Sequence, residues 1–145
     1  MNSYKHTQPG YTNLAFFAGA IALILYVSPG STSVENTYLP IAILTVISVL
    51  FCSLTIEVKK ESVTWFFGPY FWKKTIKTSE ITRVEIVTNP WWFGWGIRFT
   101  KFGWLYNVSG LQAVQITQRN GKAVRLGTDN PAALSQALNE ALKKS

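Results

Sequence analysis

Few residues in this sequence have the types and spacing that catalysis or metal binding needs. The chain has one histidine, His6, in a polar N-terminal stretch, and one cysteine, Cys52, in an apolar stretch. Nucleophilic catalysis of the familiar kind needs a base beside a serine or cysteine. A metal site needs several ligands, and the sequence places no second ligand near His6. We therefore expect no catalytic residue, no metal and no disulfide.

The carboxylates are few, and each has basic neighbours in the sequence. Glu57 and Glu61 flank an expected turn, and Glu80 and Glu85 flank an expected strand, which is typical of solvated surface charge. Gly94-Trp95-Gly96 precedes a strand and not a helix, so it is not a dinucleotide-binding fingerprint. We expect no cofactor and no enzyme activity, and an uncharacterised enzyme ranks third among the hypotheses.

Aromatic and basic side chains are interleaved between Ser62 and Tyr106. Lysine and arginine outnumber aspartate and glutamate by 14 to 7, and the chain from Glu57 onward carries the whole formal charge of +7. A surface of this kind suits an anionic lipid layer, where rings enter among headgroups and each base contributes about 1 kcal/mol. We assign five rings to such an interface and five bases to a basic patch: Trp91, Trp92, Phe93, Trp95 and Trp72, with Lys73, Lys74, Lys77, Arg98 and Lys101.

The same composition could bind single-stranded nucleic acid through base stacking and phosphate contacts. A sheet core and a lipid interface account for the rings better, so nucleic acid is not an expected partner. The expected partners are membrane lipids and another integral membrane protein or a second copy of this chain.

Two uncharged apolar segments precede the aromatic region. Leu14 to Val27 with its flanks makes 17 residues, about 25 Å of helix, which is close to a hydrocarbon core of about 30 Å. Tyr38 to Thr55 forms the second segment. The pattern predicts a frayed tail at 1–13 and a two-helix transmembrane hairpin at 14–55. The alternative for the first segment is a cleaved signal peptide.

The basic residues around these segments predict an orientation. Lys5 precedes the first segment, the connector has no base, and Lys59 and Lys60 follow the second segment. The positive-inside rule then places both termini in the cytoplasm.

After Leu54 the period of the apolar residues changes to that of strands. Register favours Val58 opposite Val63 across a short turn. The last hairpin pairs Ile116 with Val124 if a three-residue loop, Arg119 to Gly121, puts Gly121 at positive φ. Asp129 or Asn130 then caps a final helix with Pro131 in its first turn, whose apolar stripe is Leu134, Leu138 and Leu142.

Residues 54–142 resemble the bacterial PH-like domains of membrane-anchored proteins. The segments that carry the resemblance are KKTIKTSEITRVEIV from Lys73, GWGIR from Gly94, YNVSGLQAVQI from Tyr106 and LGTD from Leu126. The resemblance implies a PH-like domain at 56–145 with an antiparallel split barrel of about six or seven strands, capped by a C-terminal helix. Such domains are binding and assembly modules with no shared catalytic residues.

Together these patterns predict a membrane α hairpin plus an α+β domain in the bacterial inner membrane, multi-pass. The expected function is a membrane-anchored, non-catalytic interaction module, an assembly or accessory subunit that binds another membrane protein. The alternative is an anionic lipid surface-binding module that uses the aromatic loop and the basic patch.

Overall fold

The computed structural model describes residues 3–28, 30 and 37–144 of the chain. Within these residues nine strands form two sheets: β1 (Tyr4–Pro9), β2 (Ser53–Val58), β3 (Ser62–Phe67), β4 (Phe71–Lys77), β5 (Ile81–Thr88), β6 (Gly96–Thr100), β7 (Gly103–Asn107), β8 (Gln112–Gln118) and β9 (Ala123–Gly127). The first sheet has the order β1-β2-β3-β4, and the second has the order β5-β8-β9-β7-β6. Each sheet therefore ends in two strands that lack a neighbour on one side.

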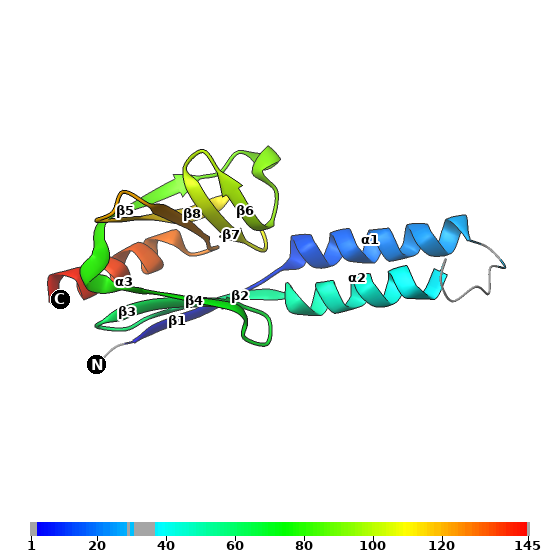
Figure 1. Ribbon diagram of the computed structural model, residues 1–145, viewed down its shortest axis with the longest axis horizontal. Helices are drawn as coiled ribbons and strands as arrows, with labels where there is room; N and C mark the ends of the chain where they lie inside the picture. Colours follow the sequence, from blue (N-terminus) through cyan, green and yellow to red (C-terminus); the bar gives the residue numbers. More distant parts are fainter. Residues whose placement is uncertain (1–2, 29, 31–36, 145) are drawn as a thin grey trace.

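The described part of the chain also has three α-helices, α1 (Tyr11–Val27), α2 (Leu39–Leu50) and α3 (Pro131–Lys144), and two short 3-10 helices, η2 (Thr78–Glu80) and η3 (Trp91–Phe93). Figure 1 shows α1 and α2 extending side by side from one end of the two sheets, and we call this pair the helical arm. At the other end α3 lies between the two sheets, where it contacts β5, β8 and β2.

The core lies between the facing surfaces of the two sheets. Alternate residues of β2 and β3 are buried there, among them Ile56 and Trp65, which stand opposite each other across the two strands. From the helix, Leu134 and Leu138 are completely buried in the same cluster. The expected apolar stripe of the last helix is therefore what packs α3 against the sheets.

Local register is where the sequence predicts best. Val58 pairs with Val63, Ile116 pairs with Val124, and Gly121 has φ of 80°, each as expected. Asn130 caps α3 through its Oδ1, which accepts a hydrogen bond from the Ala133 N–H at 3.2 Å. These features depend on a few adjacent residues, so periodicity and turn chemistry suffice to find them.

The expected fold class is wrong. The described chain has nine strands in two sheets, and not a PH-like split barrel of six or seven strands after a membrane hairpin. One cause is the N-terminal stretch, which was expected to fray but forms β1 and pairs antiparallel with β2, Tyr4 opposite Val58. Another is β7, which pairs parallel with β9, whereas the expected barrel is antiparallel.

The expected transmembrane hairpin is also wrong. Among the described residues no helix has both the length and the apolar character needed to cross a membrane. The second apolar segment is divided, because α2 ends at Leu50 and Ser53 to Thr55 already belong to β2. Twelve helical residues span about 18 Å, well short of the roughly 30 Å of a hydrocarbon core. The membrane and transmembrane assignments, and the multi-pass inner-membrane location with cytoplasmic termini, are therefore not supported.

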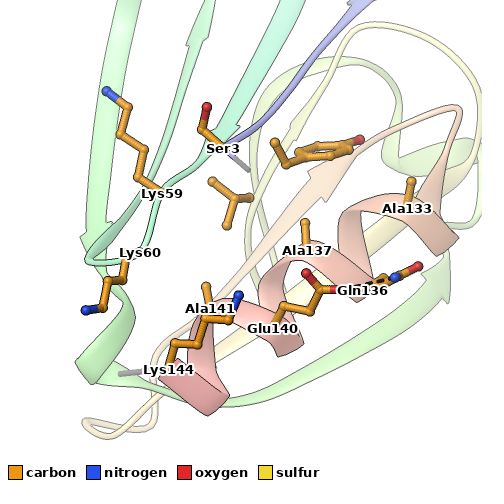
Figure 2. A pocket seen from close by; sticks show the side chains of 11 residues that line it. Ser3, Lys59, Lys60, Ala133, Gln136, Ala137, Glu140, Ala141 and Lys144 are labelled. Atoms are coloured by element: carbon orange, nitrogen blue, oxygen red, sulfur yellow. Dashed lines mark hydrogen bonds between the residues drawn. The ribbon is translucent and has the colours of Figure 1, made fainter. Parts of the chain in front are cut away.

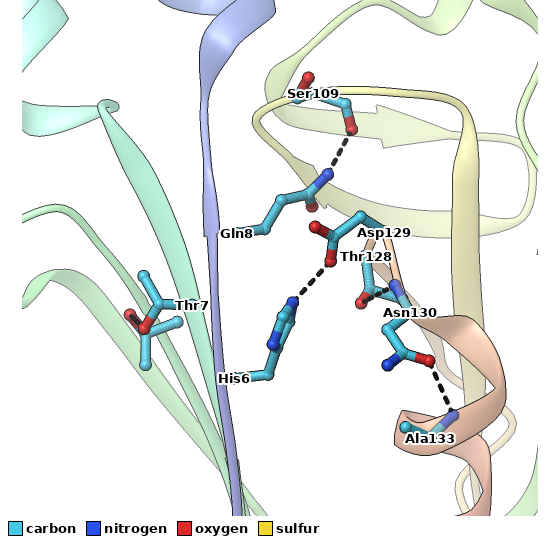
Figure 3. A network of polar contacts seen from close by, with 9 residues as sticks. His6, Thr7, Gln8, Ser109, Thr128, Asp129, Asn130 and Ala133 are labelled. Atoms are coloured by element: carbon cyan, nitrogen blue, oxygen red, sulfur yellow. Dashed lines mark hydrogen bonds and ion pairs between the residues drawn. The ribbon is translucent and has the colours of Figure 1, made fainter.

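Polar contacts hold β1 against the second sheet and the start of α3 (Figure 3). His6 Nε2 lies 2.5 Å from Oδ1 of Asp129 in the loop before α3. The buried Gln8 donates from Nε2 to the Ser109 carbonyl at 3.1 Å. The expectation that His6 has no carboxylate near it is thus wrong, because the pair is separated by 123 positions in the sequence.

Candidate functional site

The helical arm presents an unusually apolar surface. Neither α1 nor α2 contains a charged residue, and none of their residues is buried. Twelve of the twenty-one large apolar side chains that are exposed in the described chain lie between Tyr11 and Val49. A helix with so little polar surface is normally covered by other apolar groups, and an exposed apolar patch of this size marks an interaction surface.

The base of the arm is fixed to the β body by specific contacts. The Gly10 N–H donates to the Cys52 carbonyl at 2.7 Å, which joins the start of α1 to the end of α2. A Cβ on Gly10 would lie 2.9 Å from the Phe51 carbonyl oxygen, so the close approach requires glycine. Thr12 and Ser109 share a hydroxyl hydrogen bond of 2.9 Å. The arm is thereby held in a defined direction relative to both sheets.

The aromatic loop between β5 and β6 separates its rings into two kinds. Trp91 and Trp92 are 72% and 68% exposed, with their rings edge to face at 6.0 Å. Phe93 and Trp95 are partly buried. Phe93 packs 6.2 Å from Phe102, and Trp95 donates from Nε1 to the Gly110 carbonyl at 3.1 Å. Only the first pair is thus available to a partner surface.

Trp72, the fifth ring assigned to the interface, lies apart from that loop on β4. It is 49% exposed and has a positive φ of 51°, at an irregularity in the pairing of β3 with β4. Burial raises the pKa of the Tyr106 hydroxyl, and the nearby Trp72 side chain acts in the opposite direction to a smaller degree. The structure therefore does not gather all five rings on one loop.

The predicted basic patch is divided between two faces of the body. Lys74 stands opposite the buried Trp65 and so faces the space between the sheets. Lys73 and Lys77 alternate with it along β4 and face outward. Arg98 stands opposite Leu105 on β7 and donates from Nε to the Trp95 carbonyl at 3.3 Å.

Lys101, the last base of that patch, lies with its ammonium group 4.9 Å from the Phe102 ring centroid. Lys101 lines the same groove as Lys74 and Lys122, and Lys122 is a lysine that sequence reasoning did not select.

A buried arginine is the centre of a polar cluster in the second sheet. Arg125 is only 6% exposed and donates from Nε to Gln115 at 2.8 Å and from Nη1 to Asn89 at 3.0 Å. Its guanidinium carbon lies 4.0 Å from the centroid of the Phe102 ring. Burial lowers the pKa of this guanidinium, while the Glu85 carboxylate acts in the opposite direction. Sequence reasoning missed the cluster, because its members come from separate strands and loops.

A large groove of about 1020 Å³ lies between α3 and the turn that joins β2 to β3. Figure 2 shows Ala133, Ala137 and Ala141 along its helical wall, with Lys59 and Lys60 pointing away from it. The rest of its lining is mostly polar, with Tyr4, Gln136, Glu140 and Lys144 among the residues, so a carboxylate lies beside the lysines here.

The described residues contain no group of three histidine, cysteine, aspartate or glutamate side chains that could hold a metal ion. Cys52 is a free thiol at the arm base. His6 and Asp129 form a pair of the kind that hydrolases use to orient a base. The neighbouring hydroxyl, Thr7 Oγ1, is instead bonded to Thr55 Oγ1 on β2 at 2.9 Å. The pair therefore joins elements of the fold, and its contacts give it no nucleophile.

A comparison with protein-family models finds no match for this sequence, and a comparison with curated proteins finds none. The resemblance to bacterial PH-like domains of membrane-anchored proteins is therefore not supported by a family match, and the described helices and sheets contradict it.

Proposed function

We propose that this chain is a non-catalytic interaction module that binds another protein through the helical arm. One observation carries the proposal: α1 and α2 are uncharged and mostly apolar, yet none of their residues is buried. A surface of this kind in water is costly, at roughly 25 cal/mol per Å² of exposed apolar area. Covering it supplies the free energy of association.

The rest of the molecule suits a module that positions the arm. Hydrogen bonds at Gly10 and Thr12 fix the arm to both sheets, so little orientational freedom is lost on binding. The contacts around His6, the nearest approach to a catalytic base, tie β1 to the start of α3. An apolar surface on another protein, including an integral membrane protein, or the arm of a second copy would fit this surface.

The test compares two isoleucines of nearly equal exposure. Ile43 on α2 is 51% exposed, and Ile86 on β5 is 53% exposed. The tagged full-length chain is released from its own cells in a mild detergent, and the molar amount of each co-purifying protein is measured. We expect one protein near a fixed ratio to the chain, strongly reduced by Ile43→Asn and retained by Ile86→Asn.

Equal recovery with both variants would refute the role of the arm. A loss of helical circular dichroism in Ile43→Asn would mean that the arm had unfolded, and Val46→Asn, at 58% exposure, then replaces it. A complex that contains only this chain, detected by its mass, identifies the partner as a second copy.

A second candidate function is binding to an anionic lipid surface. Two observations favour it: the exposed pair Trp91 and Trp92, and the surplus of basic residues on the β body. Amphipathic indoles partition to the headgroup region of lipid layers. The loop also lies near the base of the arm. The Asn89 N–H donates to the Leu111 carbonyl, and the Trp95 Nε1–H donates to the Gly110 carbonyl. Both acceptors follow Ser109, whose hydroxyl is hydrogen-bonded to Thr12 of α1.

Flotation with protein-free vesicles tests this candidate. The full chain should float with phosphatidylglycerol-containing vesicles more than with pure phosphatidylcholine, and added salt should weaken the difference. Replacing both Trp91 and Trp92 by serine should reduce flotation. Phe99→Ser, which removes an equally exposed ring at 73%, is the control. Equal flotation on both lipids would refute the anionic preference.

A further inference from the structure

A groove of about 570 Å³ lies along the open side of the β body. It is bounded by β4, the last strand of the first sheet, and by the β6–β7 hairpin at the end of the second sheet. Two buried rings, Trp65 and Tyr106, lie edge to face at 5.3 Å and form part of its wall. Its volume is within the range of about 300–1000 Å³ found for small-molecule sites.

The groove collects positive charge from three separate segments. Lys74 comes from β4, Lys101 from the β6–β7 turn, and Lys122 from the β8–β9 loop. Its lining contains no aspartate or glutamate. In the described part of the chain none of these lysines forms an ion pair. Among the described residues, the lining of the groove therefore offers three ammonium groups to an anion and no competing carboxylate.

The wall also holds a hydrogen-bond donor that lacks an acceptor. Trp65 is 2% exposed, and its Nε1 has no hydrogen-bond partner among the residues that the structure describes. Buried donors are nearly always paired, because an unpaired one loses its hydration without compensation. Trp65 stands directly opposite Lys74 across β3 and β4. The Nε1 atom is itself buried, so an acceptor reaches it only when the side chains that cover it move. A negatively charged acceptor would then suit both groups at once.

Exposed rings supply the apolar part of the groove. Phe99 and Trp104 stand opposite each other on β6 and β7, with centroids 5.2 Å apart in an edge-to-face arrangement. Trp104 lies two positions before the buried Tyr106 on β7, so it and its partner Phe99 face the same side of the sheet as the core. Such rings favour a planar aromatic body, which can stack or meet them edge to face.

A simpler explanation accounts for only one of the residues that line the groove. Lysine on a terminal strand prevents the addition of further strands, and that accounts for Lys74. It does not account for lysines from two other loops at the same groove, nor for the donor of Trp65. We infer that this groove is a binding site for a small aromatic carboxylate, whose oxygens meet Lys74 and Trp65 while its ring lies against Phe99 and Trp104.

The test uses 2-naphthoate with the full-length chain in a zwitterionic detergent, and the detergent alone as a blank. Calorimetry should give one site per chain. In a ¹H–¹⁵N spectrum the indole signal of Trp65, assigned by its loss in Trp65→Phe, should shift on titration. Because hydrogen bonds that involve a charged group are among the stronger ones, Lys74→Gln and Trp65→Phe should each weaken binding about tenfold or more.

Lys73→Gln is the matched control, since Lys73 is the neighbouring residue on the opposite face of β4. It should change the affinity by less than about twofold, as expected for a distant, solvent-screened charge. The amide analogue, 2-naphthamide, keeps the ring and an acceptor but has no charge, and it should bind much more weakly.

Three results would overturn the inference: no saturable binding, an unshifted Trp65 indole signal at saturation, or equal losses with Lys73→Gln and Lys74→Gln. None of them bears on the helical arm, because the groove shares no residue with α1 or α2.

Discussion

Asn107 and Gly127 should behave as one unit in the stability of the β body. Asn107 is 1% exposed; its Nδ2 donates to the Gly110 carbonyl at 2.9 Å, and its Oδ1 accepts from the Ser109 N–H at 3.2 Å. A Cβ placed on Gly127 would overlap this Oδ1 and lie 2.6 Å from Cγ and 3.0 Å from Cβ of Asn107. Gly127→Ala must therefore displace the asparagine side chain.

The expected size of the effect follows from those contacts. Two hydrogen bonds contribute about 0.5–1.5 kcal/mol each, and overpacking a rigid interior costs roughly 1–3 kcal/mol. Gly127→Ala should thus lower the free energy of unfolding by about 2–6 kcal/mol. Asn107→Ala loses the hydrogen bonds alone, about 1–3 kcal/mol. The double variant should lie within about 1 kcal/mol of Asn107→Ala, because the overlap is then largely relieved.

Urea unfolding followed by circular dichroism measures all three variants in the same detergent buffer, with the slope m checked for constancy. If the two single effects instead add in the double variant, the side chains do not compete for the same space. A cost below about 0.5 kcal/mol for Gly127→Ala would refute the close approach itself.

Three further changes test other parts of the structure. Leu138→Ala empties a fully buried position on α3 and should lower the free energy of unfolding by about 2–5 kcal/mol, whereas Leu142→Ala, at a partly buried position, should cost clearly less; equal losses would contradict the packing of α3. The Lys5 side chain, through its hydrogen bond, lowers the pKa of Glu57 from its ordinary 4.5, so this carboxylate stabilises the fold above pH 4.5 and stops doing so as pH falls through its lower folded-state pKa. Denaturant unfolding from pH 7 to pH 3 should show Glu57→Gln less stable than the parent at neutral pH and converging with it in acid, and a difference that grows in acid would reverse the sign. Arg125→Ala leaves the carbonyl oxygens of Gln115 and Asn89 without their donor and should lower the free energy of unfolding by more than 2 kcal/mol in the same assay, where two groups of about 1–3 kcal/mol each are left unpaired; an unchanged midpoint would show that the cluster is not needed.

The features that sequence reasoning found are those that neighbouring residues determine. The alternation around Val58 and Val63 requires their pairing, and Gly121 in a three-residue loop follows from keeping Ile116 opposite Val124. The cap at Asn130 follows from the residues just before α3. In each case an apolar period and a turn residue leave one consistent register.

The features it missed depend on contacts between distant segments. β1 reads as a polar tail, and its six residues become a strand because β2 offers them a free edge. His6 meets Asp129 only after that pairing has formed. The apolar run that ends at Thr55 looks continuous, yet the demands of the sheet remove its last residues from the helix. Composition does not reveal such divisions.

The candidate sites show the same division. Exposure of Trp91 and Trp92 agrees with what their position in a Gly- and Pro-containing loop suggests. Closeness in sequence groups the basic residues, but alternation along β4 places Lys74 on one face and Lys73 on the other. Lys122 was not selected, since only the β8–β9 loop brings it to the groove with Lys74.

Photo-crosslinking from two phenylalanines would test most directly whether the helical arm is the binding surface. Phe16 on α1 and Phe99 on β6 are 70% and 73% exposed, and each can be replaced by p-benzoylphenylalanine in the full-length chain. Irradiation in cells should join a single protein to the variant at position 16 and none to the variant at position 99. An adduct from position 99 alone, or only lipid adducts from position 16, would contradict the proposal that α1 and α2 bind a protein.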